Sequence, residues 1–166
     1  MPLRALALAG LLALLPTVAP AQPAPRRMVL DDFNRIVALG DPQRSPDGDW
    51  VAYTVTTIDA EKDKRNTDIW MARWDGTAQQ QLTSSADNEN SPRWSPDGTY
   101  LAFLASRGTE DEKKQGAQLW LLPRQGGEAL KVSDVKGGLS NIQWSPDSTR
   151  IAFEISDVHP ADEPEK

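Results

Sequence analysis

The chain reads Ser45-Pro46-Asp47-Gly48, then Ser95-Pro96-Asp97-Gly98, then Ser145-Pro146-Asp147-Ser148, and each copy begins 50 residues after the one before. The same offset relates other segments without a gap: Ile69-Trp70 with Leu119-Trp120, Gly76 with Gly126, and Trp94 with Trp144. A fixed period is typical of repeat proteins, and a period near 50 residues is the size of one blade of a β-propeller. The sequence therefore predicts similar, consecutive sheets.

Each repeat is expected to form four antiparallel strands. The Ser-Pro-Asp segment predicts a tight turn, because proline presets φ at the first corner, aspartate accepts from nearby backbone N–H groups, and glycine tolerates a positive φ. The strand after the turn alternates apolar residues, as in 100–105, and its opposite face carries Ala52, Ala102 and Ala152. We interpret these alanines as positions where the neighbouring sheet comes close. A third strand at 118–123 and a short fourth strand at 129–133 complete the blade.

The predicted fold class is all-β, with about two and a half β-propeller blades preceded by a signal peptide and a short helix. Because propellers close with roughly 4–8 blades, we expect the chain to be a fragment of a ring. Its open blade faces would expose apolar surface, so we expect it to be poorly soluble or oligomeric. The expected segments are a signal peptide at 1–21, a lead segment at 22–41, blade 1 at 42–83, blade 2 at 92–133, the start of blade 3 at 140–156 and a polar tail at 157–166.

Residues 1–21 have the pattern of a secretory signal. Arg4 precedes an apolar run from Ala5 to Leu15, and small residues follow at Ala19-Pro20-Ala21. The apolar run is shorter than the ~20 residues that cross a bilayer, so we expect cleavage before Gln22 and no membrane attachment afterwards. The predicted location is periplasmic or secreted.

The composition excludes two classes of protein. The chain has no cysteine, so disulfides cannot stabilise it after export. Its formal net charge is −6, which argues against nucleic acid as a partner.

A short helix is predicted over Phe33–Leu39. Asp31-Asp32 would cap it, and Phe33, Ile36 and Val37 would form its apolar stripe. Gly40 and Pro42 would end it. We interpret this helix as a packing element without chemistry.

No catalytic residue, cofactor-binding residue or metal ligand is predicted in this chain. Ser140 lies in Gly138-Leu139-Ser140-Asn141-Ile142, the nearest approach to the G-x-S-x-G elbow of serine hydrolases, but the final glycine is missing and we expect Ser140 in a loop. His159 is the only histidine and has no neighbouring Ser, Cys or second His, so neither catalysis nor metal binding is expected of it. No cofactor is expected.

The repeated charged and aromatic residues are interpreted as structural. The aspartates of the three turns supply one carboxylate each and lack the alternating oxygen ligands of a calcium loop, so turn formation is favoured for Asp47, Asp97 and Asp147. The charged segments 59–65 and 110–114 fall at the same point of successive repeats and predict solvated hairpin loops. Packing between blades is expected of the tryptophan pairs Trp70 with Trp120 and Trp94 with Trp144, and exposure of Trp74.

Several segments resemble the amino-terminal part of exported serine peptidases of the prolyl oligopeptidase family, on its dipeptidyl-peptidase and acylaminoacyl-peptidase side. The resemblance covers 30–156 and rests on Gly40-Asp41-Pro42-Gln43-Arg44-Ser45-Pro46-Asp47-Gly48, Trp50-Val51-Ala52-Tyr53-Thr54-Val55, Thr67-Asp68-Ile69-Trp70, and Gln81-Leu82-Thr83 before Pro92-Arg93-Trp94-Ser95-Pro96-Asp97-Gly98. It implies a propeller paired with a carboxy-terminal α/β-hydrolase domain that carries a Ser-Asp-His triad, and nothing in this chain matches the triad. The propeller would admit short peptides and exclude folded proteins, and the missing domain would cleave the peptides by acyl transfer.

A TolB-type periplasmic propeller, which is a non-enzymatic platform for protein interactions, is the alternative. That family places an α/β domain ahead of its propeller, and residues 22–44 are too few for such a domain. A propeller lyase acting on sugars is a third possibility, for which the sequence contains no cluster of metal-binding histidines. A G-x-S-x-G elbow downstream of Lys166, followed by Asp and His, would favour the peptidase.

Overall fold

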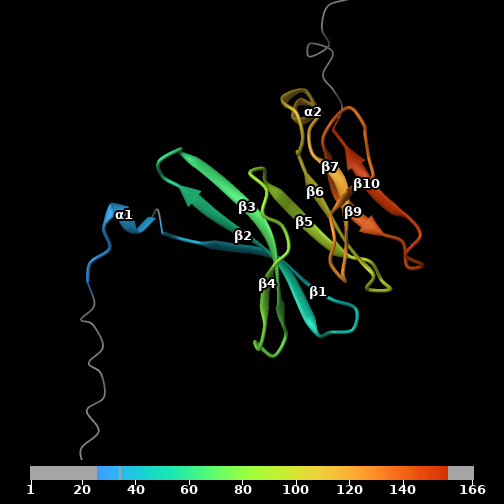
Figure 1. Cartoon of the computed structure of the whole chain (residues 1–166), viewed down its shortest axis with the longest axis horizontal. Coiled ribbons are helices and arrows are strands. Elements are labelled where there is room, and N and C mark those ends of the chain that lie inside the picture. The colour runs from blue at the N-terminus through green and yellow to red at the C-terminus, as the bar shows by residue number, and fades with distance from the viewer. Residues whose placement is uncertain (1–25, 34, 157–166) are drawn as a thin grey trace, which may run out of the picture.

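Three antiparallel sheets follow one another along the chain in the computed structural model, which describes residues 26–33 and 35–156 (Figure 1). The first two sheets contain four strands each, side by side in chain order, and the third contains two. The strands are β1 (Ala38–Arg44), β2 (Trp50–Asp59), β3 (Lys64–Arg73) and β4 (Gln79–Gln81); β5 (Glu89–Trp94), β6 (Tyr100–Ala105), β7 (Gln118–Pro123) and β8 (Leu130–Lys131); and β9 (Leu139–Trp144) and β10 (Ile151–Ile155). The prediction of an all-β chain with consecutive four-stranded blades is confirmed. The predicted signal peptide and polar tail lie outside the described residues.

The segment before the first turn does not form the expected helix: residues 35–37 are in neither a helix nor a strand, and a strand begins at Ala38. The prediction of a helix over Phe33–Leu39 is wrong in its bounds, because α1 covers only Leu30–Phe33 and Ala38 already begins β1. β1 pairs with the long strand β2 from its first residue, Ala38, onward. Amphipathic spacing is a weak local signal, and pairing with β2 satisfies the backbone of this segment along a whole strand edge.

The second charged segment also differs from its prediction. Residues 110–114 form the helix α2 (Glu110–Lys114) instead of an irregular hairpin loop. The Thr109 hydroxyl accepts from the backbone N–H of Glu112 at 3.3 Å, and the Glu112 carboxylate accepts from the Thr109 N–H at 2.7 Å. This capping box, with acidic residues in the first turn and lysines in the last, favours one helical turn.

The Ser-Pro-Asp turns repeat one set of hydrogen bonds. The Ser45 hydroxyl donates to the Asp47 carboxylate at 2.6 Å and accepts from the Trp50 N–H at 3.0 Å. The Asp47 carboxylate also accepts from the Asp49 N–H at 3.1 Å. The hydrogen bond to Ser45 is the largest cause that lowers the pKa of Asp47 to about 2, so this carboxylate is ionised and engaged in the turn. The same serine-to-aspartate bond recurs at 2.6 Å in the two later copies.

Serine at the last position of the third turn leaves the turn type unchanged. Ser148 has a φ of 60°, near the 80° of Gly48 and the 72° of Gly98. A serine in this left-handed region is strained relative to glycine. The Ser148 hydroxyl accepts a hydrogen bond at 3.0 Å from the backbone N–H of Asp97 in the preceding repeat, which compensates part of that strain.

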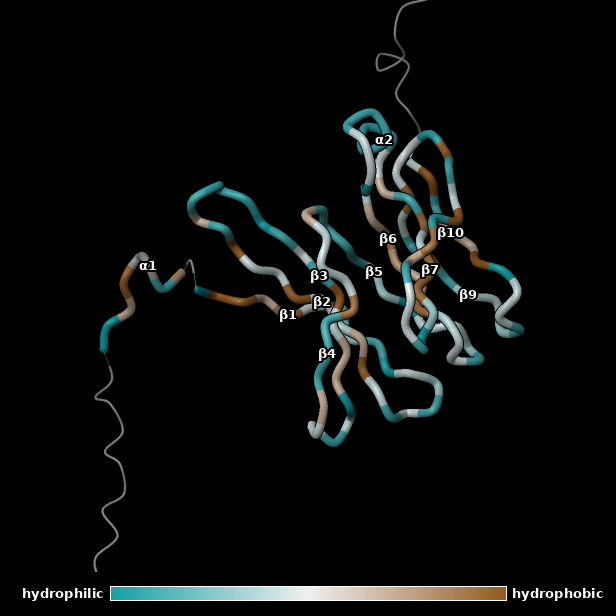
Figure 2. Tube along the Cα trace, in the orientation of Figure 1, coloured by the Kyte–Doolittle hydropathy of each residue, from teal (hydrophilic) through white to brown (hydrophobic). Residues whose placement is uncertain are grey.

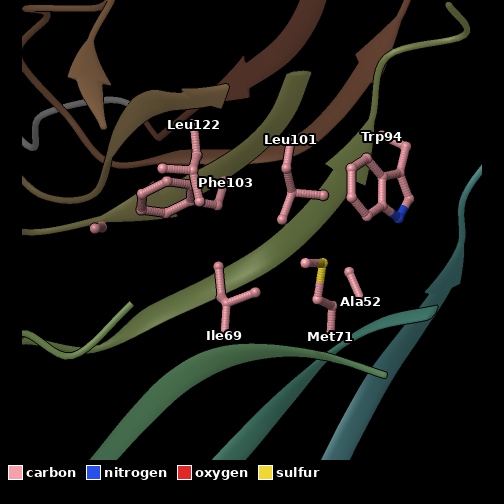
Figure 3. Packing of buried hydrophobic residues seen from close by; sticks show 8 residues of the cluster. Ala52, Ile69, Met71, Trp94, Leu101, Phe103 and Leu122 are labelled. Carbon is pink, nitrogen blue, oxygen red and sulfur yellow. The ribbon is translucent and has the colours of Figure 1, made fainter. Parts of the chain in front are cut away.

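The apolar core lies between consecutive sheets. Side chains of the first sheet, namely Ala52, Ile69 and Met71, face side chains of the second sheet, namely Trp94, Leu101, Phe103 and Leu122 (Figure 3). A second cluster joins the opposite face of the second sheet to the third sheet and contains Ala102, Leu104, Leu119, Leu139 and Ile142. The second sheet is therefore apolar on both faces, and Figure 2 shows hydrophobic stretches along the strands with hydrophilic hairpin ends.

The repeated alanine position has the role expected of it where two sheets meet. Ala52 and Ala102 are completely buried between neighbouring sheets, whereas Ala152 is exposed because no further sheet covers the third one among the described residues. Apolar side chains are exposed on the outer face of the first sheet for the same reason, among them Leu39 at 69%. These faces are the apolar surface that the repeat pattern predicts for an incomplete ring.

One tryptophan in the second sheet and one in the third connect each of these sheets to the sheet before it. The indole N–H of Trp94 donates to the carbonyl of Gln43 at 3.1 Å, and that of Trp144 donates to the carbonyl of Arg93 at 3.0 Å. Both donors and both acceptors are 50 residues apart, so the same contact joins the first sheet to the second and the second to the third. The regular spacing of these tryptophans in the sequence reflects this contact.

We expect Trp144→Phe to lower the free energy of unfolding by about 1 kcal/mol, because it removes one hydrogen bond and leaves the Arg93 carbonyl without its donor. Urea unfolding of the full chain would measure the change. Trp74→Phe is the matched control, because the Trp74 side chain is 65% exposed, and it should change the free energy by much less. Equal effects of the two substitutions would contradict a role for the indole contact.

Candidate functional site at the inner edges of the sheets

The first strand of every sheet forms one of its edges, and these edges meet. β1, β5 and β9 each lie at the end of their strand order. β5 contacts both β1 and β9, and the three strands lie next to one another in Figure 1. Strands at this position surround the central channel of a β-propeller. We call the free edges of β1, β5 and β9 the inner edge, and they are the part of the chain placed to meet a ligand in such a channel.

Each inner-edge strand has an irregularity at the same repeat position. Asp41, Ser91 and Asn141 are 50 residues apart and have positive φ values of 44°, 55° and 51°. The pairing register shifts around each of them. Non-glycine residues seldom adopt this conformation, so its threefold recurrence shows that the repeat imposes it. Because a β-bulge redirects the side chains of its strand, the inner edge gains one short polar residue per sheet.

An ion pair joins the first two strands of the inner edge. An Arg93 guanidinium nitrogen, Nη1, lies 2.8 Å from Asp41 Oδ2 and also donates to the Pro92 carbonyl at 2.7 Å. The other oxygen of Asp41 accepts from the Gln43 amide at 2.8 Å. The Arg93 and Asp41 side chains are 33% and 30% exposed, so the pair is held in place yet accessible to solvent.

A depression of about 390 Å³ lies beside this pair, at the end of the inner-edge strands that leads to the Ser-Pro-Asp turns. Its walls include Arg93 and the repeat-related amides Gln43 and Gln143. Guanidinium and amide groups donate and accept hydrogen bonds, and they suit the carbonyl, N–H and carboxylate groups of a peptide. Such a site can bind and orient a peptide, but it holds no nucleophile with an adjacent base.

The sequence-based expectations for single residues have different outcomes. Ser140 was expected in a loop, and this is wrong, because Ser140 lies in β9 and pairs with Glu154 of β10. The bulge at Asn141 lets the strand continue through this segment. His159 lies outside the described residues. Within 26–33 and 35–156, no group of three or more His, Cys, Asp or Glu side chains could hold a metal ion.

The ion pair at the inner edge was missed by sequence reasoning. Asp41 and Arg93 lie in adjacent repeats and occupy different repeat positions, so the 50-residue register does not align them. The sequence does contain one signal for this site: Asp41 and Asn141 occupy the same repeat position, and Asp and Asn are residue types that tolerate a positive φ. No helix in the described part of the chain is long and apolar enough to cross a membrane.

Solved structures provide the comparison with known proteins, because no protein-family model and no curated protein sequence matches the chain. The acylaminoacyl peptidase of Pyrococcus horikoshii is 28% identical, with a TM-score of 0.56, over 72% of this chain and 17% of that protein. The β-propeller domain of the Trilobed protease from Pyrococcus furiosus is 25% identical, with a TM-score of 0.56, over 70% of this chain and 34% of that one. A putative TolB from Agrobacterium tumefaciens is 24% identical, with a TM-score of 0.54, over 73% of this chain and 39% of that one.

These similarities agree with a β-propeller architecture for the chain. The TolB similarity shows the fold alone, because its identity is low. The chain spans about a sixth of the acylaminoacyl peptidase that it matches. The chain is similar to a propeller portion of the prolyl oligopeptidase family.

Proposed function

We propose that this chain is the amino-terminal propeller portion of an exported serine peptidase that hydrolyses short peptides. The observation that carries the proposal is the similarity of the chain to acylaminoacyl peptidase, at 28% identity over 72% of the chain. In this proposal the catalytic serine, aspartate and histidine belong to an α/β-hydrolase domain outside the present sequence. The propeller controls which molecules reach that domain.

The inner edge supports a role in admitting peptides. β1, β5 and β9 present strand edges that no further strand covers among the described residues, together with the Asp41–Arg93 pair. An extended peptide can exchange hydrogen bonds with such an edge as it passes, whereas a folded protein is too wide to enter a propeller channel. The propeller would select substrates by size and leave bond cleavage to the hydrolase domain.

A TolB-type interaction platform is the second candidate. The putative TolB shares the fold of this chain over 73% of its length, and this fold is compatible with either candidate. In a TolB-type platform the inner edge would bind a protein segment without catalysis. The two candidates differ in one testable property, which is the presence of an activated serine in the protein that carries these blades.

We expect the protein isolated from its native host to react with a fluorophosphonate probe for activated serines. Antibodies against the exposed hairpin at 59–65 would capture the protein, and the captured material would be tested with the probe, with short chromogenic peptides and with a folded protein substrate. Labelling, peptide cleavage and failure to cleave the folded substrate are expected. Recovery in the periplasmic or secreted fraction would test the predicted export.

A protein that is captured in good yield but neither labelled nor active would contradict the peptidase proposal. Co-capture of one defined protein in that case would favour the TolB-type candidate. A preparation whose probe labelling is blocked by phenylmethylsulfonyl fluoride provides the control for non-specific reaction. Cleavage of folded and short substrates at equal rates would contradict the size-selection role alone.

A further inference from the structure

A charged cluster is buried between the first two sheets, away from the inner-edge pair. It contains Asp68 of β3, Glu89 at the start of β5 and Arg107 after β6. Glu89 is completely buried and Arg107 is 20% exposed. A carboxylate is buried at this depth only when its charge is compensated, so the partners of each oxygen decide what the cluster can do.

The two oxygens of Glu89 have very different surroundings. Oε1 accepts from Arg107 Nε at 2.9 Å and Nη2 at 2.7 Å, and from the Ser85 hydroxyl. Oε2 is buried without any hydrogen-bond partner. The Arg107 guanidinium is fixed in this position because it stacks over the rings of Phe103 at 5.2 Å and Trp120 at 5.0 Å. Held in this position, Arg107 donates its hydrogen bonds to Oε1 and none to Oε2.

Asp68, like Glu89, has one buried oxygen without a hydrogen-bond partner. Its Oδ2 accepts from the Asn66 amide at 3.1 Å, whereas Oδ1 is buried without a partner. The two carboxyl groups lie within hydrogen-bonding reach of each other. Two carboxylates and one guanidinium leave one negative charge uncompensated, and a single proton between the two carboxyl groups would neutralise it and satisfy both oxygens.

We propose that Asp68 and Glu89 share one proton across the contact between the first two blades, and that loss of this proton loosens the contact. Burial, followed by the charge of Glu89, raises the pKa of Asp68 to about 6, which supports the assignment. The other charged neighbours, Asp87 and Lys113, pair with each other at 2.8 Å. The contact would respond to pH in the range found outside the cytoplasm, and this proposal does not depend on the peptidase assignment.

The next contact along the chain provides an internal comparison. The positions equivalent to Asp68 and Glu89, 50 residues later, are Gln118 and Leu139. The Gln118 carbonyl accepts from Ser133 at 2.9 Å and from the Val135 N–H at 3.1 Å, so the second contact is neutral and satisfied without a proton. The repeat can therefore be built without carboxyl groups here, and the proton-sharing pair is particular to the first contact.

The folded chain holds the proton of Asp68 more tightly than the unfolded chain, whose Asp has its ordinary pKa of 3.8. The resulting stabilisation is present at acidic pH and is lost as the pH rises through about 6. Because Asp68 is partly exposed, we expect the folding equilibrium constant of the full chain to fall by a factor of about 10 or less between pH 5 and pH 7. Urea unfolding at several pH values, followed by tryptophan fluorescence, would measure it.

Asp68→Asn should abolish this pH dependence, because asparagine keeps an oxygen and adds a permanent donor toward Glu89. Glu128→Gln removes an exposed carboxylate and is the matched control, whose profile should follow the unmodified chain. A direct readout needs no variant to fold: the unmodified chain should show an infrared band of protonated carboxylic acid that is lost at about pH 6, apart from the bands of exposed carboxyl groups, which are lost at about pH 4. The proposal would be overturned if the stability of Asp68→Asn changed with pH in parallel with that of the unmodified chain, or if that band were absent.

A cation between the carboxyl groups is the competing explanation. Calcium chloride added at pH 7 should leave the stability of the unmodified chain unchanged relative to Asp68→Asn if a proton occupies the position. A selective stabilisation of the unmodified chain by calcium would overturn proton sharing in favour of a metal site.

Hydrogen exchange tests whether loss of the proton loosens the contact. The exchange of β3 and β5 amides should accelerate from pH 5 to pH 7 by more than the intrinsic exchange rate increases. Unchanged protection factors would contradict the loosening of the contact.

Discussion

Phe103→Ala is expected to lower the free energy of unfolding by about 3–5 kcal/mol. Phe103 is completely buried, and it packs between the first and second sheets against side chains such as Ile69 (Figure 3). Truncation removes the ring from the apolar contact between the two sheets, and no disulfide reinforces this contact because the chain has no cysteine. The Arg107 guanidinium also loses one of the two rings over which it stacks. Urea unfolding of the full chain would measure the loss.

Phe153→Ala provides a matched control, because Phe153 occupies the same repeat position in the third sheet and is 38% exposed. We expect it to cost about 1 kcal/mol or less. The comparison separates burial between sheets from the general effect of losing a phenylalanine. Similar losses at the two positions would show that the second sheet does not rest on the first in the way described.

Arg107→Ala is expected to lower the free energy of unfolding at pH 7 by about 3–5 kcal/mol. The substitution leaves Glu89 completely buried with no cation, next to the carboxyl group of Asp68. It also removes the guanidinium from the face of Trp120. The loss should be smaller at pH 5, because protonation of a carboxyl group then replaces the missing positive charge. Unfolding measured at both pH values would test the size and the direction.

Arg124→Ala tests whether position in the fold determines this effect. Arg124 also contacts an aspartate and a tryptophan ring, at 2.6 Å from Asp47 Oδ2 and 5.6 Å from Trp94, but both partners of the ion pair are partly exposed. We expect a loss of about 1 kcal/mol or less, with little difference between pH 5 and pH 7. A loss at Arg124 as large as that at Arg107 would contradict the special cost of the buried charge.

The candidate site was only partly predictable. The repeat offset locates the inner-edge strands, because it fixes which strand comes first in each blade. It does not reveal the contact of Asp41 with Arg93 or the burial of Glu89, because each of these depends on residues from two different sheets. The prediction of a helix over Phe33–Leu39 was wrong because its last two residues, Ala38 and Leu39, pair with β2, and local spacing does not reveal that pairing.

The sequence by itself determined the fold class, the number of strands in a complete blade and the structure of the Ser-Pro-Asp turns. These features depend on local chemistry and on a strict period: proline and serine with aspartate define each corner, and alternation defines each strand. Only the tertiary structure decided which polar groups meet between blades. Asp68 and Glu89 lie in different sheets and differ from their counterparts Gln118 and Leu139, so a periodic pattern carries no information about their contact. Their proximity arises because two sheets pack face to face and exclude the water that would otherwise keep the two charges apart.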